Sequence, residues 1–328
     1  MVAFPDKEDW MDIETGAFAG LLGRSPAMER LRRDVAQLGP SELRVHVCGE
    51  TGTGKENVAR ALHALSPRAR RRFVPVNVAG FNDELLASEL FGHARGAFTG
   101  AVAAREGYVV EAEGGTLFVD EVAEMSALAQ VRLLRFLQEG EYQRVGETCS
   151  RKADVRVISA TNVDLAQRVR EGHFRMDLWY RLKVDRIVVP PLRERGDDVL
   201  LLARHFLRRQ AEGRGEPAPG LTRRAAESLA RYHWPGNVRE LEGEMQRLAV
   251  RVCGRAVTLE DLSPEVRGPG RAPAGGLQAA LQRLEVDLVR GALERHRGIL
   301  SQAAAELGIT RQSLWAKVRR LGLVVDGM

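Results

Sequence analysis

The segment RVHVCGETGTGKE, residues 44–56, joins an apolar strand pattern to a glycine-rich loop and then to the start of a helix. Glycines allow backbone N–H groups to turn inward around phosphate oxygens, and the N-terminus of a helix adds partial positive charge. Lys55 supplies a mobile cation for the outer phosphates of a nucleotide. The segment therefore predicts a phosphate-binding loop, with contacts from Gly49, Glu50, Thr51, Gly52, Thr53, Gly54, Lys55 and Glu56.

The residue after Lys55 departs from the usual pattern of such loops. Ser or Thr at this position normally ligates Mg²⁺ through its hydroxyl, and Glu56 has no hydroxyl. Another group, or water, must therefore complete the shell of a metal ion bound beside this loop.

A second motif, GGTLFVDE at residues 114–121, places two acids at the end of another apolar strand. Asp120 is expected to hold Mg²⁺, directly or through water, and Glu121 to polarise the attacking water. Paired acids at a strand end are more often solvated caps than catalysts. The phosphate-binding loop upstream reverses that expectation, and the two motifs together predict hydrolysis of a nucleoside triphosphate.

The hydrophobic pattern divides the chain into segments. Short apolar strands alternate with amphipathic helices through residues 17–190, which predicts an α/β domain with a mostly parallel sheet. Residues 191–262 have a helical pattern. Residues 263–276 hold four Gly and three Pro and are interpreted as a linker to a second helical segment, residues 277–328. Residues 1–16, with five acids and one Lys, form an acidic N-terminal tail.

The composition excludes several classes of protein. With 44% hydrophobic and 28% charged residues among 328, the chain is neither disordered nor fibrous. No apolar run approaches the ~20 residues that cross a bilayer, which excludes a membrane protein. The three Cys lack C-x-x-C spacing, which argues against a disulfide framework or a zinc finger and for a reducing, cytoplasmic compartment. The net charge of +5 permits nucleic-acid binding without demonstrating it.

The C-terminal segment has the order of a helix-turn-helix. A helix is expected over about 277–296, followed by SQAAAEL at 301–307 and RQSLWAKVRR at 311–320. Small alanines let two helices approach closely, and Gly308 permits the tight turn between them. The basic run then lies on a recognition helix, and a small helical hairpin for dimerisation is the alternative. The expected DNA contacts are Thr310, Arg311, Gln312, Ser313, Lys317, Arg319 and Arg320.

Between the two nucleotide motifs lies ELFGHARGAFTGA, residues 89–101. GAFTGA after ELFGH, downstream of GETGTGKE and upstream of GGTLFVDE, closely resembles the sigma-54-dependent transcription activators, the NtrC-like enhancer-binding proteins of the AAA+ superfamily. The resemblance begins at about Phe18 and extends nearly to the C-terminus. It implies an AAA+ ATPase core over 17–190, a helical lid over 191–262 and a Fis-type DNA-binding domain over 277–328, with ATP and Mg²⁺ as cofactors.

The resemblance also implies roles for individual residues. Asn77 is similar to the Asn that holds the Walker B Glu in check, and Thr161 with Asn162 resembles sensor I. Arg175 and Arg181 resemble the arginines offered to a neighbouring subunit's ATP, and Arg239 resembles sensor II. The loop expected to contact sigma-54, with Phe98 and Thr99 at its tip, consists of Gly96, Ala97, Phe98, Thr99, Gly100 and Ala101.

These roles imply a mechanochemical activator. A hexameric ring would bind double-stranded enhancer DNA and use ATP to convert the closed complex of sigma-54 RNA polymerase into an open one. The AAA+ pattern starts by about residue 18, which is typical of stand-alone activators controlled by a separate regulatory protein. Two alternatives remain: a DNA-binding repressor whose AAA+ domain only senses nucleotide or drives assembly, and an AAA+ remodeller outside transcription. The intact GAFTGA loop favours the activator.

Overall fold

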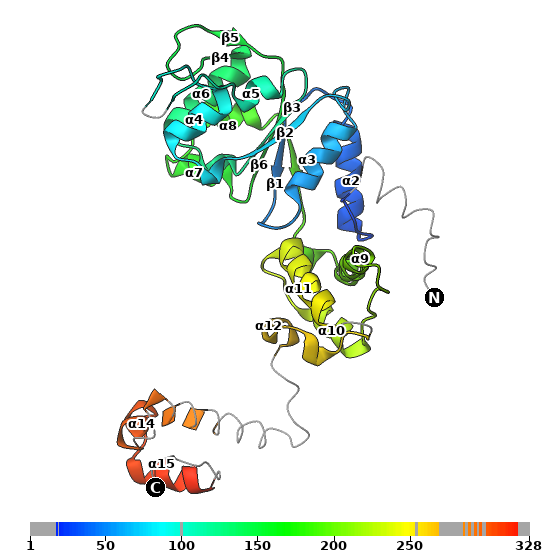
Figure 1. Cartoon of the computed structure of the whole chain (residues 1–328), viewed down its shortest axis with the longest axis vertical. Coiled ribbons are helices and arrows are strands. Elements are labelled where there is room, and N and C mark those ends of the chain that lie inside the picture. Colours follow the sequence, from blue (N-terminus) through cyan, green and yellow to red (C-terminus); the bar gives the residue numbers. More distant parts are fainter. Residues whose placement is uncertain are drawn as a thin grey trace. The chain divides into compact units, whose positions relative to one another are not determined.

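The computed structural model describes residues 18, 20–98, 101–252, 255–268 and 300–320, together with single residues and pairs between 285 and 296. The chain forms two compact units, Met1–Val266 and Arg267–Met328 (Figure 1). The acidic segment 1–16 lies outside the described residues. Within the part of the chain that the structure describes, no helix is long and apolar enough to cross a bilayer.

A five-stranded parallel sheet organises the first unit. Its strand order is β2 (Phe73–Asn77), β3 (Thr116–Asp120), β6 (Arg156–Thr161), β1 (Val45–Cys48) and β7 (Asp185–Val188). All six residues of β6 are buried, as a central strand covered on both faces requires. A small antiparallel ribbon is formed by β4 (Glu141–Tyr142) and β5 (Arg151–Lys152).

Helices cover both faces of this sheet (Figure 1). Side chains of β3 alternate between two cores: Leu117 and Val119 face one, and Phe118 faces the other. The core around Phe118 is closed by α2 (Pro26–Leu38) and α3 (Lys55–Ala64). The opposite core is closed by α4 (Asp83–Phe91), α5 (Tyr108–Glu111), α6 (Ala127–Glu139), α7 (Leu165–Arg170) and α8 (Met176–Leu182).

A helical lid with its own core completes the first unit. Trp234 is fully buried at its centre, and its indole N–H donates to the carbonyl oxygen of Leu229 at 2.9 Å. The lid helices are α9 (Asp198–Glu212), α10 (Arg223–Arg231), α11 (Asn237–Arg251) and α12 (Pro264–Arg267). Short 3₁₀ turns occur at η1 (Val78–Gly80), η2 (Val122–Glu124), η3 (Leu192–Glu194) and η4 (Leu259–Asp261).

The linker expected over 263–276 begins later than its composition indicates. Residues 264–267 form α12, and Val266 is buried in the lid core. This helix cannot be predicted from composition, because a single buried apolar residue, Val266, attaches it to the lid. Residues 269–276 lie outside the described part of the chain.

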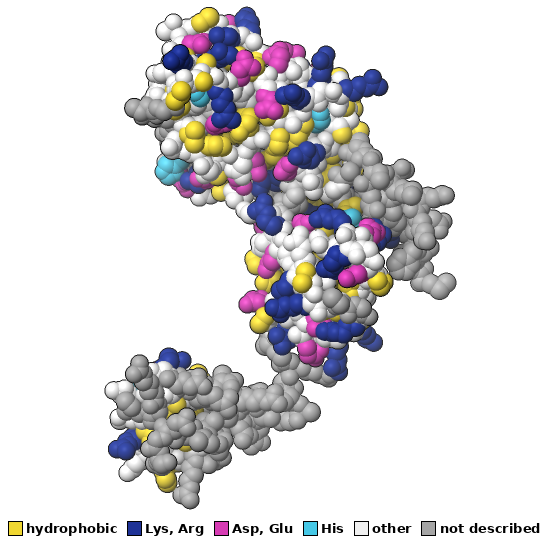
Figure 2. All heavy atoms as spheres, in the orientation of Figure 1, with side chains coloured by type: hydrophobic (Ala, Val, Ile, Leu, Met, Phe, Trp, Pro, Cys, Tyr) yellow, Lys and Arg dark blue, Asp and Glu magenta, His cyan; other side chains and the backbone are white. Residues whose placement is uncertain are grey.

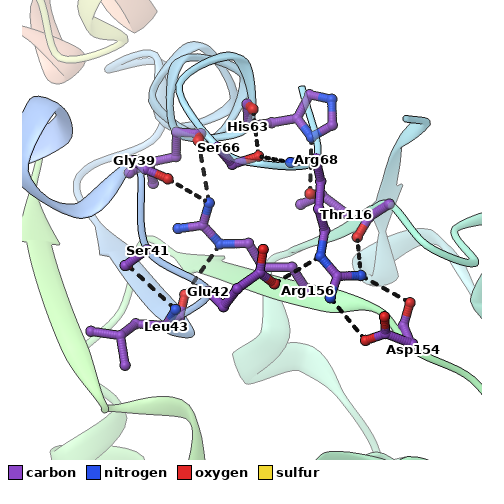
Figure 3. Close-up of polar contacts among 12 residues, drawn as sticks. Gly39, Ser41, Glu42, Leu43, His63, Ser66, Arg68, Thr116, Asp154 and Arg156 are labelled. Carbon is purple, nitrogen blue, oxygen red and sulfur yellow. Dashed lines mark hydrogen bonds and ion pairs between the residues drawn. The ribbon is translucent and has the colours of Figure 1, made fainter. Parts of the chain in front are cut away.

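Buried arginine fixes the amino edge of the sheet (Figure 3). The Arg156 guanidinium, only 2% exposed, donates to the carbonyl oxygens of Gly39 at 3.0 Å and Leu38 at 3.1 Å. Burial lowers its pKa. Beside it, Arg68 pairs with Glu42 at 2.7 Å and Asp154 at 2.8 Å. These contacts attach the end of α2 to β6 at the amino edge of the sheet. The loops of the candidate site lie at the opposite, carboxyl edge.

The second unit contains the expected helix pair, α14 (Leu300–Glu306) and α15 (Arg311–Arg320). Gly308, with φ of 67°, makes the turn between them. Ala303 and Ala304 are buried against Leu314 and Val318, as the sequence pattern predicts. Of the helix expected over 277–296, the structure describes only single residues and pairs.

Candidate nucleotide site at the carboxyl edge of the sheet

The sheet brings the two nucleotide motifs together. Cys48 of β1 and Thr161 of β6 are in register, and β3 lies next to β6. The loops that follow these three strands therefore leave the same edge of the sheet, where open parallel sheets bind ligands. Gly49, Glu121 and Asn162 are the first residues of these loops.

The phosphate-binding loop is closed at its helical end by Lys55, the first residue of α3. Lys55 is only 6% exposed, and its Nζ donates to the carbonyl oxygen of Gly49 at 3.1 Å. Thr53 donates its backbone N–H and its hydroxyl to the carbonyl oxygen of Glu50, at 3.3 and 2.8 Å. Gly54 caps α3 in the left-handed region, with φ of 100°. The loop thus has the local form that its sequence predicts.

The two acids at the end of β3 differ in their surroundings. Burial, and secondly the charge of Glu121, raise the pKa of Asp120. Glu121 has a φ of 55°, a left-handed conformation that is uncommon for a residue with a side chain. Its Oε1 lies 3.6 Å from Lys55 Nζ, and its Oε2 accepts the backbone N–H of Asn162 at 3.3 Å. Lys55, Glu121 and Asn162 therefore form one cluster.

The sensor I candidates lie beside this cluster. Asn162 donates from Nδ2 to the Thr51 hydroxyl oxygen at 2.9 Å, so it contacts the phosphate-binding loop as well as Glu121. Thr161 is fully buried, and its hydroxyl oxygen accepts the N–H of Val163 at 3.2 Å. Asn162 therefore connects the loop after β1, through Thr51, with the loop after β3, through Glu121.

Asn77 ends β2 in register with Asp120. Its Oδ1 accepts the backbone N–H of Ala79 at 3.0 Å and so caps η1. Among the hydrogen bonds of the described residues, none joins Asn77 to Glu121. The restraint of Glu121 by Asn77 stays a prediction.

The lid packs directly on the phosphate-binding loop. The backbone N–H groups of Val238 and Arg239 both donate to the carbonyl oxygen of Gly52, at 2.9 and 3.3 Å. Gly52 has a φ of 77°, and a Cβ there would lie 2.2 Å from the carbonyl oxygen of Gly236. Glycine at position 52 is therefore required by the lid as well as by the turn.

Asn237, which belongs to none of the sequence motifs above, completes this junction. It is fully buried, and its Nδ2 donates to Glu50 at 3.2 Å and to the Thr51 carbonyl oxygen at 3.0 Å. Its Oδ1 accepts the N–H of Leu192 at 2.8 Å. Arg193 pairs with Glu50 through two contacts of 2.6 and 2.8 Å. These hydrogen bonds from Arg193 and Asn237 lower the pKa of Glu50 to about 2.

A second buried lid residue supports the same loop. Arg195 is 3% exposed and donates to the carbonyl oxygens of Thr53 and Pro190, both at 2.8 Å. Burial lowers its pKa to about 10. The PPLRER stretch at 190–195 could have drawn attention to it, but the sequence does not show that its partner lies 142 residues away.

Asn237→Ala should destabilise this junction by about 1–3 kcal/mol. The substitution leaves the buried N–H of Leu192 without its acceptor and removes the donor to the Thr51 carbonyl oxygen. Urea unfolding of the chain measures the loss. Gln246→Ala, at an exposed position of the same helix, is the control and should leave the midpoint unchanged. Equal midpoints for the two variants would contradict the structural role given to Asn237.

The two candidate arginines belong to α8 and its N-cap. Arg175 is the N-cap residue of α8, and its half-exposed guanidinium pairs with Asp177 at 2.6 Å. Arg181 is exposed, and its Nε donates to the Leu137 carbonyl oxygen at 3.4 Å. No hydrogen bond or ion pair that the described residues make links either arginine to Lys55.

Hydrogen bonds hold the residues at the base of the candidate sigma-54 loop. Gly96 N–H donates to the Ala101 carbonyl oxygen at 2.8 Å and closes the loop. The ring of His93 contacts the Ser88 hydroxyl at 2.7 Å and the Ala103 carbonyl oxygen at 3.1 Å. Phe98 packs against that ring, with 5.0 Å between ring centroids. Thr99 and Gly100 lie outside the described residues.

The candidate DNA-contacting residues lie on α15. Thr310 caps the helix by accepting the Ser313 N–H at 3.2 Å. Arg311, Gln312 and Ser313 are exposed, and Lys317 pairs with Glu285. The side chains of Arg319 and Arg320 lie outside the description.

Three family models match consecutive parts of the chain. They are the Sigma-54 interaction domain over residues 21–188, the AAA+ ATPase lid domain over 193–275, and the bacterial regulatory protein, Fis family, over 280–321.

Relatives match the chain over most of its length. It is 48% identical over 302 residues to the transcriptional regulatory protein ZraR of Salmonella typhimurium, covering 92% of this chain and 68% of ZraR. It is 43% identical over 341 residues to the DNA-binding transcriptional regulator NtrC of Azospirillum brasilense, covering 94% and 71%. The crystal structure of NtrX from Brucella abortus in complex with ATP has a TM-score of 0.72 at 35% identity, covering 97% of this chain and 72% of NtrX. The chain therefore belongs to the sigma-54-dependent transcriptional activators, with an AAA+ ATPase-type domain, its lid and a Fis-family helix-turn-helix domain.

Proposed function

We propose that this protein hydrolyses ATP to remodel the closed complex of sigma-54 RNA polymerase into an open complex, acting from enhancer DNA. The observation that carries the proposal is the cluster of Lys55, Glu121 and Asn162 at the sheet edge. The GAFTGA loop belongs to the same compact unit. The ATP complex of NtrX, a relative of similar fold, supports ATP as the nucleotide.

Nucleotide binding is expected to change the surroundings of the general base. Lys55 Nζ lies 3.6 Å from Glu121, so the two charges partly neutralise each other. A triphosphate carries more negative charge than one carboxylate and would draw Lys55 toward itself. Glu121 is then free to accept a proton from the attacking water. Binding would thus prepare the base as well as hold the substrate.

The residues at this edge fit a magnesium ion. Asp120 and Glu121 are adjacent carboxylates, and burial together with the Glu121 charge raises the pKa of Asp120. A divalent cation would relieve this repulsion. Mg²⁺ typically uses one or two carboxylates, substrate phosphates and water, so Asp120 would hold it without a full protein cage. Bound there, it would neutralise charge on the phosphates.

The α8 arginines support a ring in which ATP lies between subunits. Arg175 is half-exposed and pairs with a residue of its own helix, so its guanidinium can turn toward a neighbour. Met176 and Tyr180 beside it are 59% and 68% exposed, so apolar surface adjoins the arginine. We infer that this surface faces the ATP site of a second copy, in a hexameric or similar ring.

The helix-turn-helix is proposed to bind double-stranded enhancer DNA. Arg311, Gln312 and Ser313 are exposed in the first turn of α15, where recognition helices contact base edges. Acidic and basic side chains are interspersed on the visible face of the first unit, without a continuous basic patch (Figure 2). The position of these few side chains, rather than the net charge, therefore supports DNA binding.

Thr99→Ala should retain ATP hydrolysis and lose open-complex formation. Position 99 lies in the loop proposed to contact sigma-54, whereas the nucleotide cluster lies at the ends of β1, β3 and β6. The two activities can therefore be measured on one preparation. Val102→Ala, at an 82% exposed position just after the loop, serves as the control. Normal transcription by Thr99→Ala would show that the loop assignment is wrong.

An open-complex assay on a sigma-54 promoter, with purified protein and hydrolysable ATP, tests the whole proposal. The full chain should open the promoter, and a non-hydrolysable analogue should not support opening. Deletion of residues 277–328 should abolish enhancer binding and retain ATPase activity. Hydrolysis without promoter opening by the full chain would favour the nucleotide-sensing repressor instead.

A further inference from the structure

Gln130 is a buried polar side chain of α6 that none of the roles above uses. It is only 2% exposed. Its Nε2 donates to the carbonyl oxygens of Met125 at 2.8 Å and His173 at 3.1 Å. Its Oε1 accepts the backbone N–H of Arg175 at 2.9 Å. Both N–H donors of the amide and its oxygen are therefore engaged.

The partners of Gln130 belong to two parts of the proposed catalytic machinery. Met125 ends η2, the turn that follows Glu121. His173 lies in the segment before α8, and Arg175, the arginine proposed to serve a neighbour, is the N-cap residue of α8. One amide group thus joins the segment after the general base to the backbone of the candidate arginine finger. The contacts span 5, 43 and 45 residues of sequence.

The backbone of Arg175 determines where its guanidinium can reach. Arg175 is an N-cap residue, so its N–H has no acceptor within the helix, and Gln130 supplies one. Its side chain is half-exposed and, within the described part of the chain, pairs with Asp177 of the same helix. Among the hydrogen bonds of the described residues, the one to Gln130 therefore joins the Arg175 backbone N–H to α6.

We propose that Gln130 is a positioning residue for ATP hydrolysis: it holds Arg175 at a fixed place relative to the Walker B segment of its own chain, for use by the neighbouring subunit. The inference rests on the proposed action of Arg175 in trans. Phe174 and Leu178 are buried in the core and keep α8 attached without Gln130. Loss of the amide should therefore misplace the arginine rather than unfold the helix.

If Gln130 affects only the ATP site of the neighbouring subunit, rings that contain two kinds of variant subunit should reveal it. Gln130→Leu keeps the side-chain volume and removes all three hydrogen bonds. Alone, it should lower kcat by about 10–100-fold, the scale of a small misplacement of a catalytic group, and change the nucleotide KM far less. Gln138→Leu, the same substitution at an exposed position of α6, is the control and should hydrolyse ATP normally.

Subunit mixing is the decisive measurement. Lys55→Ala subunits have a defective phosphate site and an intact Arg175, so mixing them with Gln130→Leu subunits should recover ATPase activity. Mixing Gln130→Leu with Arg175→Ala should recover none, because both damage the arginine-donating side. Unfolding midpoints check that each variant is folded.

The outcomes separate this inference from the function on which it rests. If Arg175→Ala is rescued by Lys55→Ala and folded Gln130→Leu is not, Gln130 acts within its own site and the positioning role is wrong. If neither mixture recovers activity, the trans action of Arg175 fails and the role of Gln130 fails with it. Recovery of Gln130→Leu by Arg175→Ala would also overturn the inference.

Discussion

Glu121→Gln should bind ATP normally and hydrolyse it about 10²–10⁴-fold more slowly, the range that general base catalysis contributes. The amide has the shape of the carboxylate, so packing at the end of β3 should persist. It cannot accept a proton from water at neutral pH. The expected signature is a nucleotide Kd that does not rise, with the loss confined to turnover, measured by nucleotide titration and single-turnover hydrolysis.

The change should also remove the Lys55–Glu121 ion pair. Because this pair competes with the triphosphate for Lys55, the variant should bind ATP at least as tightly as the unchanged protein. Glu124→Gln, the same substitution three residues further on at a site paired with Arg168, is the control and should turn over normally. Normal turnover by Glu121→Gln would identify a different residue as the base.

Arg175→Ala should reduce ATP turnover by about 10³–10⁵-fold, the effect expected of an arginine finger supplied by another subunit. The guanidinium is half-exposed and pairs with Asp177, and such surface pairs contribute little to stability. The free energy of unfolding should therefore change little. Turnover and unfolding midpoint are measured on the same preparation, with Arg170→Ala, at an exposed position of α7, as the control.

Mixing with Lys55→Ala subunits distinguishes action in trans from action within one chain. Each Arg175→Ala subunit keeps an intact phosphate-binding loop, and each Lys55→Ala subunit keeps an intact arginine. Neighbouring pairs of opposite kind then form complete sites, and activity should exceed the sum of the two separate preparations. If the mixture is no more active than that sum, the arginine does not serve a neighbour.

The sequence predicts what is local in this site. Residues 49–55 and 114–121 each contain a strand end and the residues that act there, so their arrangement follows from short-range geometry. The parallel sheet then brings them together, because carboxyl ends of parallel strands share one edge. The same reasoning predicts the α14–α15 turn at Gly308. These features need no knowledge of distant contacts.

The residues that sequence reasoning misses act through distant partners. Asn237 donates to a carbonyl oxygen 186 residues away, and Gln130 accepts an N–H 45 residues away. Nothing in their neighbourhood distinguishes them from ordinary helical residues. The start of α12 is missed for a similar reason, because Val266 is buried by helices far earlier in the chain. Hydrogen bonds between residues far apart in sequence can be identified only from the three-dimensional structure.

The strand order has a consequence for biogenesis. β1 directly precedes the phosphate-binding loop, yet both of its partners, β6 and β7, come more than 100 residues later in the chain. At translation rates of about 5–20 residues per second, β1 waits on the order of ten seconds for its first neighbour. Such non-local pairing slows folding. The loop that begins at Gly49 is therefore synthesised well before the strands that fix its working shape.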